Sequence, residues 1–329
     1  MGIEITGWGK CTPSAVLTNS DLETILDTDD EWITTRTGVK QRRIAEAPLS
    51  EIGTIAAKHA LAAADKDPNE IDAVMMATCT PEFLIPSTAS RVQMNIGNNT
   101  AAAFDFNSAC SGFVYGLTTA YSMIHSGIFN NVLLVGGEKV SYFLDWTARD
   151  TAVLFGDGAG AAVISATNKN EGVLSTHLHS EGKFAEELAL IKPATTFWID
   201  KIIEDENEDG SGYSPVMNGN FVFKNAVIRF EEVIFEALNY SNLKPEDISL
   251  LIPHQANLRI SQFIQKRLGL DDDQVFNNSI RHSEKYDSSK IIERNQRIIK
   301  KYQSLVRSAI ALDALLESEQ YEISDVKIS

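Results

Sequence analysis

Cys110 combines a residue type and a setting suited to nucleophilic chemistry. It lies in Asn107-Ser-Ala-Cys-Ser-Gly, between a predicted strand at 101–106 and a predicted helix at 113–125. A thiol at that junction faces the positive end of the helix dipole and free backbone N–H groups. Both lower the thiol pKa and can bind the oxyanion formed when a thiolate attacks a thioester. A nucleophile is therefore one interpretation, although a cysteine in such a position is more often a buried packing residue.

His254 is the second candidate, in Pro253-His-Gln-Ala-Asn, where a predicted strand at 249–254 ends and a helix begins. A neutral imidazole at a helix N-terminus keeps a depressed pKa and can donate a hydrogen bond to a developing enolate. The alternative is a capping or core histidine. His177 and His179 form a His-x-His pair, but the sequence nominates no third ligand, so no metal site is predicted.

Composition and charge bound the class of protein. The chain has 329 residues with a net charge of −16, and its three cysteines have no metal-ligand spacing. Such cysteine usage is typical of free thiols in a reducing compartment, so we expect a cytoplasmic location. The acidic balance argues against nucleic acid as a partner. No apolar run approaches the ~20 residues that a membrane helix needs, and Met1-Gly-Ile-Glu does not begin a signal peptide.

Two segments half a chain apart repeat one order of elements. Residues 55–79 and 230–254 each read as a helix, a turn (Pro68-Asn-Glu-Ile and Pro245-Glu-Asp-Ile) and a short apolar strand. Uniformly apolar strands are typical of a sheet covered by helices on both faces. The repeat therefore predicts an α/β architecture built from two similar halves.

Two glycine-containing segments are interpreted as turns or loops. Residues 151–165 read as two buried strand pieces joined by a turn at Phe155-Gly-Asp-Gly-Ala-Gly, which lacks the Lys-Ser/Thr of a phosphate loop. The acidic residues 203–213 read as a solvated loop.

These segments together resemble the β-ketoacyl-acyl-carrier-protein synthase III family, from residue 1 to about residue 278. Five motifs fall in the family's order: Asp27-Thr-Asp-Asp-Glu-Trp-Ile-Thr-Thr-Arg-Thr-Gly, Asn107-Ser-Ala-Cys-Ser-Gly-Phe, Phe155-Gly-Asp-Gly-Ala-Gly, Met217-Asn-Gly-Asn and His254-Gln-Ala-Asn-Leu-Arg. The resemblance implies a five-layered αβαβα thiolase-like fold and a homodimer. Its N-terminal half, 1–168, would carry Cys110, and its C-terminal half, 169–329, would carry His254.

The resemblance also implies an activity and a set of site residues. Cys110 would take an acyl group from acyl-CoA, and His254 would stabilise the enolate of malonyl-acyl carrier protein during condensation to 3-oxoacyl-acyl carrier protein, the step that initiates fatty-acid synthesis. Both thioesters are substrates, and no cofactor or metal is implied. The positions matched to CoA binding are Thr28, Trp32, Arg36, Arg149, Gly219 and Asn220. Those matched to docking of the carrier protein are Lys224, Arg259, Lys266 and Arg267. Ile85 matches the position that closes the primer pocket and suggests a short or branched primer.

The end of the chain departs from the family pattern. The family places an Asn, in a Gly-Asn-Thr motif, thirty residues after His254, but position 284 is Glu. None of the 20 glycines and 9 prolines lies beyond Gly269, and residues 291–316 have a loosely helical pattern. Two explanations stay open: a one-nucleotide shift of reading frame near residue 279, or a divergent native tail.

The departure leaves three functions open. The first is the synthase itself, with condensation impaired because an anionic Glu284 would repel the enolate. The second is a non-condensing acyltransferase or a relative from secondary metabolism, which needs Cys110 but not the missing Asn. The third is a catalytically inactive partner subunit, which the intact Cys110 argues against.

Overall fold

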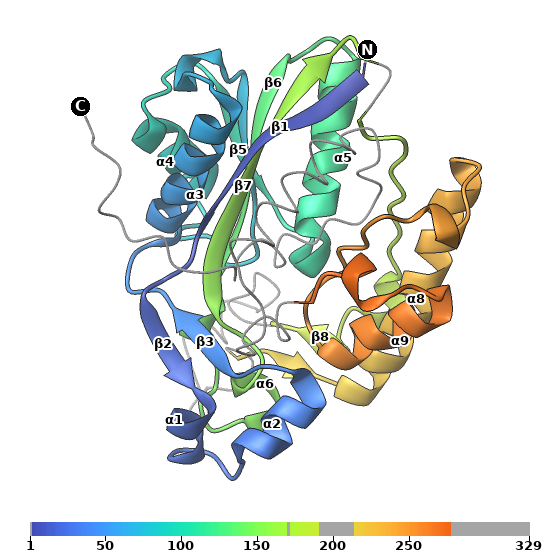
Figure 1. Cartoon of the computed structure of the whole chain (residues 1–329). Coiled ribbons are helices and arrows are strands. Elements are labelled where there is room, and N and C mark those ends of the chain that lie inside the picture. Colours follow the sequence, from blue (N-terminus) through green and yellow to red (C-terminus); the bar gives the residue numbers. More distant parts are fainter. Residues whose placement is uncertain (1, 170–171, 191–213, 278–329) are drawn as a thin grey trace.

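A five-stranded mixed sheet forms the centre of the molecule (Figure 1). The computed structural model describes residues 2–169, 172–190 and 214–277. The strand order is β1-β7-β6-β4-β5, in which β5, β4 and β6 run parallel and β7 and β1 are antiparallel to their neighbours. The five strands are β1 (Gly2–Cys11), β4 (Ala73–Ala77), β5 (Ala102–Phe106), β6 (Asn131–Lys139) and β7 (Asp157–Thr167).

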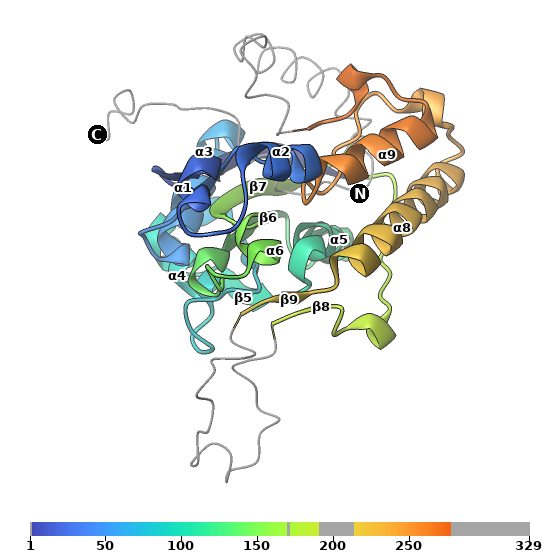
Figure 2. The ribbon, with the colours of Figure 1, turned by 90° about the horizontal axis from the view of Figure 1, so that it is seen from below.

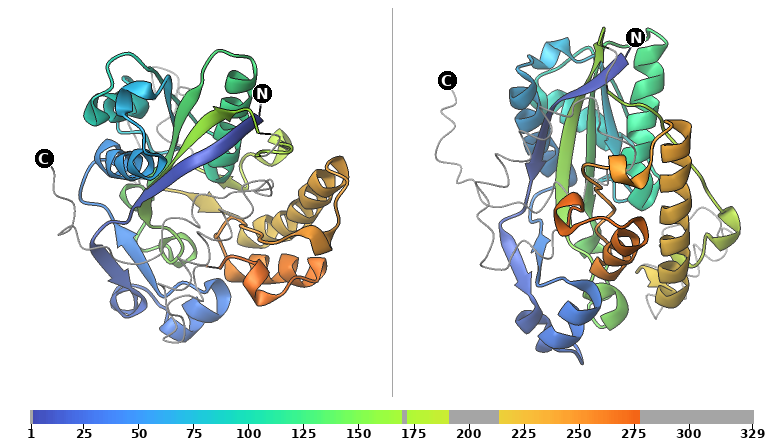
Figure 3. Two further views of the ribbon diagram at one scale, coloured as in Figure 1. Left: turned by 45° about the horizontal axis from the view of Figure 1, so that its top comes forward. Right: turned by 45° about the vertical axis from the view of Figure 1, so that its right-hand side comes forward.

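Helices cover both faces of this sheet, as the apolar strands predicted. All five residues of β4 are buried, because its side chains meet helices on either side. On one face lie α3 (Leu49–Ala64) and α4 (Thr88–Ile96), and on the other lies α5 (Gly112–His125); the right-hand view of Figure 3 shows the three layers. Each face has its own hydrophobic core.

Close packing of α3 against β1 depends on two glycines. A Cβ added at Gly9 would lie 2.3 Å from the Ala56 carbonyl oxygen, and one at Gly7 would lie 2.4 Å from the Ala60 carbonyl oxygen. The strand therefore touches the helix backbone, which only glycine permits. After α3, the predicted turn is a 3₁₀ helix at Pro68–Glu70 that leads into β4.

The second half repeats the helix and the turn but not the predicted strand. Helix α8 (Gly219–Tyr240) is followed by a 3₁₀ turn at Pro245–Asp247. In place of a strand at 249–254, Leu251 forms an isolated parallel bridge with Val275. The strand prediction was wrong for the described residues because a strand needs pairing along its length, and here only one residue pair supplies it. Helix α9 (Leu258–Leu268) then packs against α8 around its own apolar cluster.

The segment 151–165 also differs from its prediction. It begins within a short helix, α6 (Arg149–Ala152), and continues as the single strand β7 rather than as two pieces. Gly158 and Gly160 are not in a turn, since they pair with Glu138 and Gly136 of β6. Apolar neighbours and ladder pairing on both sides override the low strand propensity of glycine. Residues 203–213 and 291–316 lie outside the described residues.

A smaller unit stands at one end of the sheet. The antiparallel pair of β2 (Ala15–Thr18) and β3 (Gln41–Ile44), with α1 (Asn19–Glu23) and α2 (Asp30–Thr37) between them in the chain, packs with α6 around buried Leu22 and Ile33. Figure 2 shows α2 beside α9 and the two-stranded ladder of β8 (Leu188–Ala189) and β9 (Val216–Met217) leading into α8. Across the described ranges, no helix is both long enough and apolar enough to cross a membrane.

Candidate active site

Cys110 lies where the sequence predicted, at the junction between β5 and α5. It occupies a 3₁₀ turn, Ala109–Ser111, directly before the first residue of α5. Ala109 has φ of 45°, a left-handed conformation that costs a non-glycine residue about 1–2 kcal/mol. The Asn107 Oδ1 atom accepts a hydrogen bond of 3.1 Å from the Ala109 N–H and holds this turn. The result is an exposed thiol at the N-terminus of a 14-residue helix.

His254 lies in a loop, four residues before α9 begins. It is therefore not at the helix N-terminus that the sequence predicted; Asn257 occupies the capping position there. The loop is held by Gln255, whose Nε2 atom donates to the carbonyl oxygens of Pro253 and Phe276 at 2.8 and 3.0 Å. These bonds fix the backbone on which the imidazole stands.

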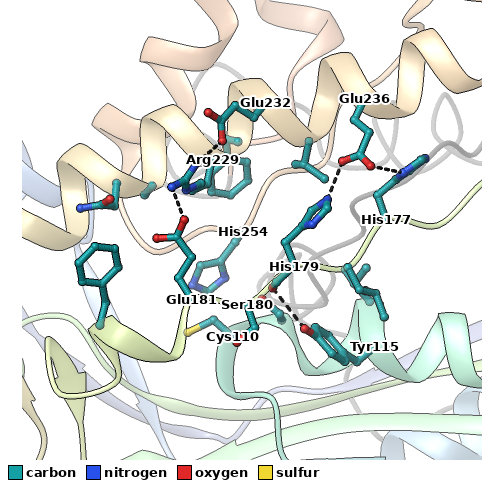
Figure 4. Close-up of a pocket in the computed structure, with 18 of the residues that line it drawn as sticks. Cys110, Tyr115, His177, His179, Ser180, Glu181, Arg229, Glu232, Glu236 and His254 are labelled. Carbon is teal, nitrogen blue, oxygen red and sulfur yellow. Dashed lines mark hydrogen bonds and ion pairs between the residues drawn. The ribbon is translucent and has the colours of Figure 1, made fainter.

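Cys110 and His254 line one cavity of about 940 Å³. Its walls come from α5, the segment 173–188 and α8, and apolar side chains such as Val114 and Phe230 line much of it. Figure 4 shows the thiol and the imidazole next to each other at the base of the cavity. The structure thus brings together the two residues that sequence reasoning singled out.

Charged pairs bind the 173–188 segment to α8 and close one wall of the cavity (Figure 4). The two Glu236 oxygens contact His177 Nδ1 at 3.1 Å and His179 Nε2 at 2.6 Å. The hydrogen bond from His179, followed by that from His177, lowers the Glu236 pKa. Further along, Arg229 pairs with Glu181. The His-x-His pair therefore meets a carboxylate 57 positions beyond His179, which the sequence alone could not indicate.

Those three side chains do not make a metal centre. Within the described part of the chain, no group of His, Cys, Asp and Glu is arranged to hold a metal ion. The carboxylate is engaged with both rings by hydrogen bonds, so the cluster serves to fasten the wall.

Glu138 is a site neighbour that sequence reasoning missed. Its carboxylate accepts hydrogen bonds from the Cys79 N–H at 2.8 Å and from the Thr80 and Thr78 hydroxyls at 2.5 and 3.2 Å. Desolvation raises its pKa despite these bonds. An acidic residue directly after the apolar run 132–137 was the available signal, because a charge there ends up beside the strand termini that carry the site.

The other two cysteines are in packing environments, as predicted. Burial raises the pKa of Cys11 to about 11. Burial and then the neighbouring Glu138 charge raise the pKa of Cys79, and a smaller contribution comes from Cys110, so the two thiols share one end of the sheet. Neither is poised as a thiolate at neutral pH.

The residues matched to the CoA entrance form a stack on α2 and α6. The guanidinium carbons of Arg36 and Arg149 each lie 4.4 Å from the centroid of the Trp32 ring. Arg149 also donates to the Asp27 carbonyl oxygen at 2.8 Å, next to Thr28. The predicted group is therefore assembled, with Arg149 resting directly on the indole.

The remaining predicted positions lie on α8 and α9. Gly219 and Asn220 are exposed in the first turn of α8, outside the lining of the cavity. Four exposed basic residues follow on the two helices: Lys224, Arg259, Lys266 and Arg267. Arg259 lies 5.6 Å from the Phe223 ring, and Arg267 forms a two-pronged ion pair with Glu231. The pair reduces the positive charge that this surface presents.

Ile85 does not line the cavity formed by the described residues. It stands in the 81–86 loop with 88% of its surface exposed, beside the equally exposed Leu84. Its role at a primer pocket stays a prediction.

Comparison with known proteins decides the family. A model of 3-oxoacyl-[acyl-carrier-protein] synthase III matches residues 104–182. The β-ketoacyl-[acyl-carrier-protein] synthase III 2 of Vibrio cholerae serotype O1 is 45% identical over 85% of this chain and 75% of the relative. The synthase III of Aquifex aeolicus is 44% identical over 84% of both chains. The chain belongs to the β-ketoacyl-acyl-carrier-protein synthase III family.

The fold of this family member agrees with solved structures. The crystal structure of the Aquifex aeolicus 3-oxoacyl-[acyl-carrier-protein] synthase III superposes with a TM-score of 0.78, at 42% identity over 92% of each chain. The thiolase-like α/β fold predicted from the motifs is thereby confirmed.

The C-terminal tail of this chain matches a different family model. A model of a family of unknown function covers residues 260–327, which begin inside α9. The tail pattern therefore recurs in other sequences, which a reading-frame shift shared with them and a divergent native tail would both produce.

Proposed function

We propose that the chain transfers an acyl group from acyl-CoA to Cys110 and condenses it with malonyl-acyl carrier protein to give 3-oxoacyl-acyl carrier protein. The observation that carries the proposal is the shared cavity: Cys110 at the start of α5 and His254 before α9 line the same space. A nucleophilic thiol and an imidazole in one pocket are two of the groups that such a reaction requires.

In the first half-reaction the Cys110 thiolate attacks the carbonyl carbon of the acyl-CoA thioester. The new C–S bond forms, the bond to CoA breaks, and CoA leaves as a thiolate that takes up a proton from water. The positive end of the α5 helix dipole would stabilise the oxyanion that forms in between. The acyl group is stored as a thioester on Cys110.

In the second half-reaction malonyl-acyl carrier protein loses CO₂, and its enolate attacks the acyl-cysteine. Cys110 leaves as a thiolate and is ready for another cycle. Decarboxylation places negative charge on the thioester oxygen, which needs neutral hydrogen-bond donors. His254 supplies one such donor; family resemblance places the other at position 284, where this chain has Glu.

The Glu at position 284 predicts that the two half-reactions differ in efficiency. Loss of one oxyanion donor costs roughly 10²–10³ in rate in other enzymes, and an anionic carboxylate opposes the enolate further. Acyl transfer to Cys110 depends less on the missing Asn. We expect the transfer step to be partly retained and the condensation step to be slow.

Binding of the two substrates is assigned to separate surfaces. We assign the adenine end of CoA to Trp32 and Arg149, with Thr28 and Arg36 beside them, and the pantetheine arm to Gly219 and Asn220. The acidic carrier protein would contact the four basic residues of α8 and α9, a local exception to the chain's net charge of −16. The homodimer, the cytoplasmic location and the absence of a cofactor remain predictions from the sequence.

A second candidate is a non-condensing acyltransferase. Glu284 favours it, because transfer of an acyl group to another acceptor involves no enolate. The identity of 45% with a synthase III favours condensation. The two functions share the Cys110 acyl-enzyme and separate at the next step.

One labelling experiment tests both. The protein is incubated with radiolabelled acetyl-CoA, and malonyl-acyl carrier protein is added afterwards. Label on Cys110 that moves to 3-oxoacyl-acyl carrier protein supports the synthase, and label that stays or moves to another acceptor supports the acyltransferase. A folded protein that takes no label refutes both and leaves the inactive partner subunit.

A further inference from the structure

The stack of Trp32 and Arg149 depends on how α2 and α6, which carry these two residues, are held next to each other. Trp32 belongs to α2, whereas Arg149 opens α6, a helix of only four residues. A helix so short has no stability of its own. Its position must be fixed by contacts with the rest of the unit.

A buried polar network joins the two helices. Arg42 of β3 has 3% of its surface exposed. Its Nε atom donates to the Val153 carbonyl oxygen at 3.0 Å, and its Nη2 atom donates to the same oxygen. Val153 caps the C-terminus of α6, so this guanidinium anchors the helix that carries Arg149.

The other side of the guanidinium reaches α2 through Asn19. Arg42 Nη1 donates to Asn19 Oδ1, and Asn19 is 2% exposed. Asn19 Nδ2 in turn donates to Asp30 Oδ1 at 2.6 Å and to the Val39 carbonyl oxygen at 2.9 Å. Asp30 is the first residue of α2, and Val39 follows its C-terminus. One chain of hydrogen bonds, buried at Arg42 and Asn19, thus runs from the end of α6 to both ends of α2.

We propose that Asn19 and Arg42 are positioning residues for the nucleotide end of acyl-CoA, because they fix the distance between Trp32 and Arg149. This inference rests on the proposed function, which assigns that end of CoA to the stack. The planar guanidinium can bind the Val153 carbonyl and the Asn19 amide at once, which the single ammonium of a lysine cannot do in the same geometry. Neither residue takes part in the thioester chemistry at Cys110.

Two donors separate positioning from general stability. Acetyl-CoA has the nucleotide, whereas acetyl-pantetheine presents the same thioester without it. In the Arg42→Lys and Asn19→Ser variants we expect KM for acetyl-CoA in Cys110 acylation to rise about tenfold, equivalent to about 1.4 kcal/mol. The KM for acetyl-pantetheine should change less than about twofold by the same measure.

Asn98 provides a matched control. Asn98 is 0% exposed and also bridges backbone groups, since its Nδ2 atom donates to the Pro68 and Ile71 carbonyl oxygens at 2.7 and 2.9 Å. It follows α4 and bonds to the turn before β4, so it belongs to neither α2 nor α6. Asn98→Ser should lower the melting temperature and leave the ratio of the two KM values at its wild-type level.

The outcomes are distinct. If Arg42→Lys and Asn19→Ser change the KM values for both acyl donors equally, as is expected of the control Asn98→Ser, the positioning role is overturned. If wild-type protein shows no acylation by either donor, the proposed function fails first. Should Arg42→Lys not fold, titration calorimetry of CoA binding to Asn19→Ser decides: unchanged affinity overturns the inference, and affinity reduced about tenfold supports it.

Discussion

At the scale of single residues, the three thiols of this chain have different environments despite sharing one side chain. Cys110 is exposed at a helix N-terminus, whereas Cys11 and Cys79 are partly buried. The difference arises from the backbone that comes after each thiol: only Cys110 is followed by small residues and the N-terminus of a long helix. A reactive cysteine is thus defined by the backbone around it.

Selective alkylation tests this difference. At about pH 7.5, iodoacetamide should modify Cys110 first, because burial holds the pKa of Cys11 near 11 and raises that of Cys79 further. Peptide mass mapping over time gives the three rates. Cys110→Ser should leave the chain almost unlabelled, whereas Cys11→Ser should change nothing. Modification of Cys79 as fast as Cys110 would contradict the assignment.

Glu138 should give the stability of the protein a pH dependence. Desolvation raises its pKa above 4.5 in the folded protein, so the folded state holds the proton more tightly than the unfolded chain. The stabilisation that protonated Glu138 gives the folded state is fully present below pH 4.5 and is lost as the pH rises through the folded-state pKa.

Glu138→Gln removes this titration while keeping an oxygen acceptor. The free energy of unfolding of the wild type, relative to this variant, should therefore fall as the pH rises from about 4.5 through the raised pKa, as urea denaturation would show. A difference that stays flat or increases over that range would mean that the carboxylate is not held at a raised pKa.

At the scale of elements, the sequence predicted what local pattern determines and failed where distant partners decide. Helix α5, strand β6 and the junction at Cys110 followed from apolar runs and small residues. Strand β7 was misread because glycine suggests a turn, yet pairing with β6 keeps Gly158 and Gly160 extended, and Gly160 also pairs with β1. The strand expected at 249–254 reduces to one bridge because its pairing is not encoded locally.

The site shows the same division. Cys110 and His254 could be nominated from their flanking residues, and the family motifs supplied Trp32 and Arg149. The contact of His179 with Glu236 could not be predicted, since it depends on how α8 lies across the 173–188 segment. Long-range polar pairs carry no local sequence signal.

The contact between β1 and α3 gives a prediction at this scale. Gly9→Ala would place a Cβ 2.3 Å from the Ala56 carbonyl oxygen and 2.4 Å from the Ala60 nitrogen. Overpacking of this kind should destabilise the protein by about 1–3 kcal/mol in a denaturation experiment. Gly182→Ala is the matched control, because a Cβ there meets nothing within 4 Å, and its effect should stay within about 0.5 kcal/mol. Equal effects would show that β1 does not press on the helix.

At the scale of the whole molecule, the chain combines a complete first half with a tail that departs from its family. The sheet, its two layers of helices and the nucleophile belong to the first half. The second half contributes α8 and His254 to the cavity wall, and α9 packs against α8 behind it. Acyl transfer depends mainly on the first half, whereas condensation requires donors from the second.

Replacing the tail tests this division. In a chimera, residues 278–329 are exchanged for the corresponding end of the Aquifex aeolicus synthase III, which is 44% identical to this chain over the matched region. The family pattern implies that the exchange places an Asn at the position of Glu284, so condensation with malonyl-acyl carrier protein should increase by roughly 10²–10³. The rate of Cys110 acylation should change little, since its groups lie before the exchanged segment. Single-turnover measurements of the two steps give both rates, and the same chimera with Cys110→Ala controls for background. If the chimera is properly folded and condensation does not increase, the tail is not what limits this enzyme, and a defect in the first 277 residues must be sought instead.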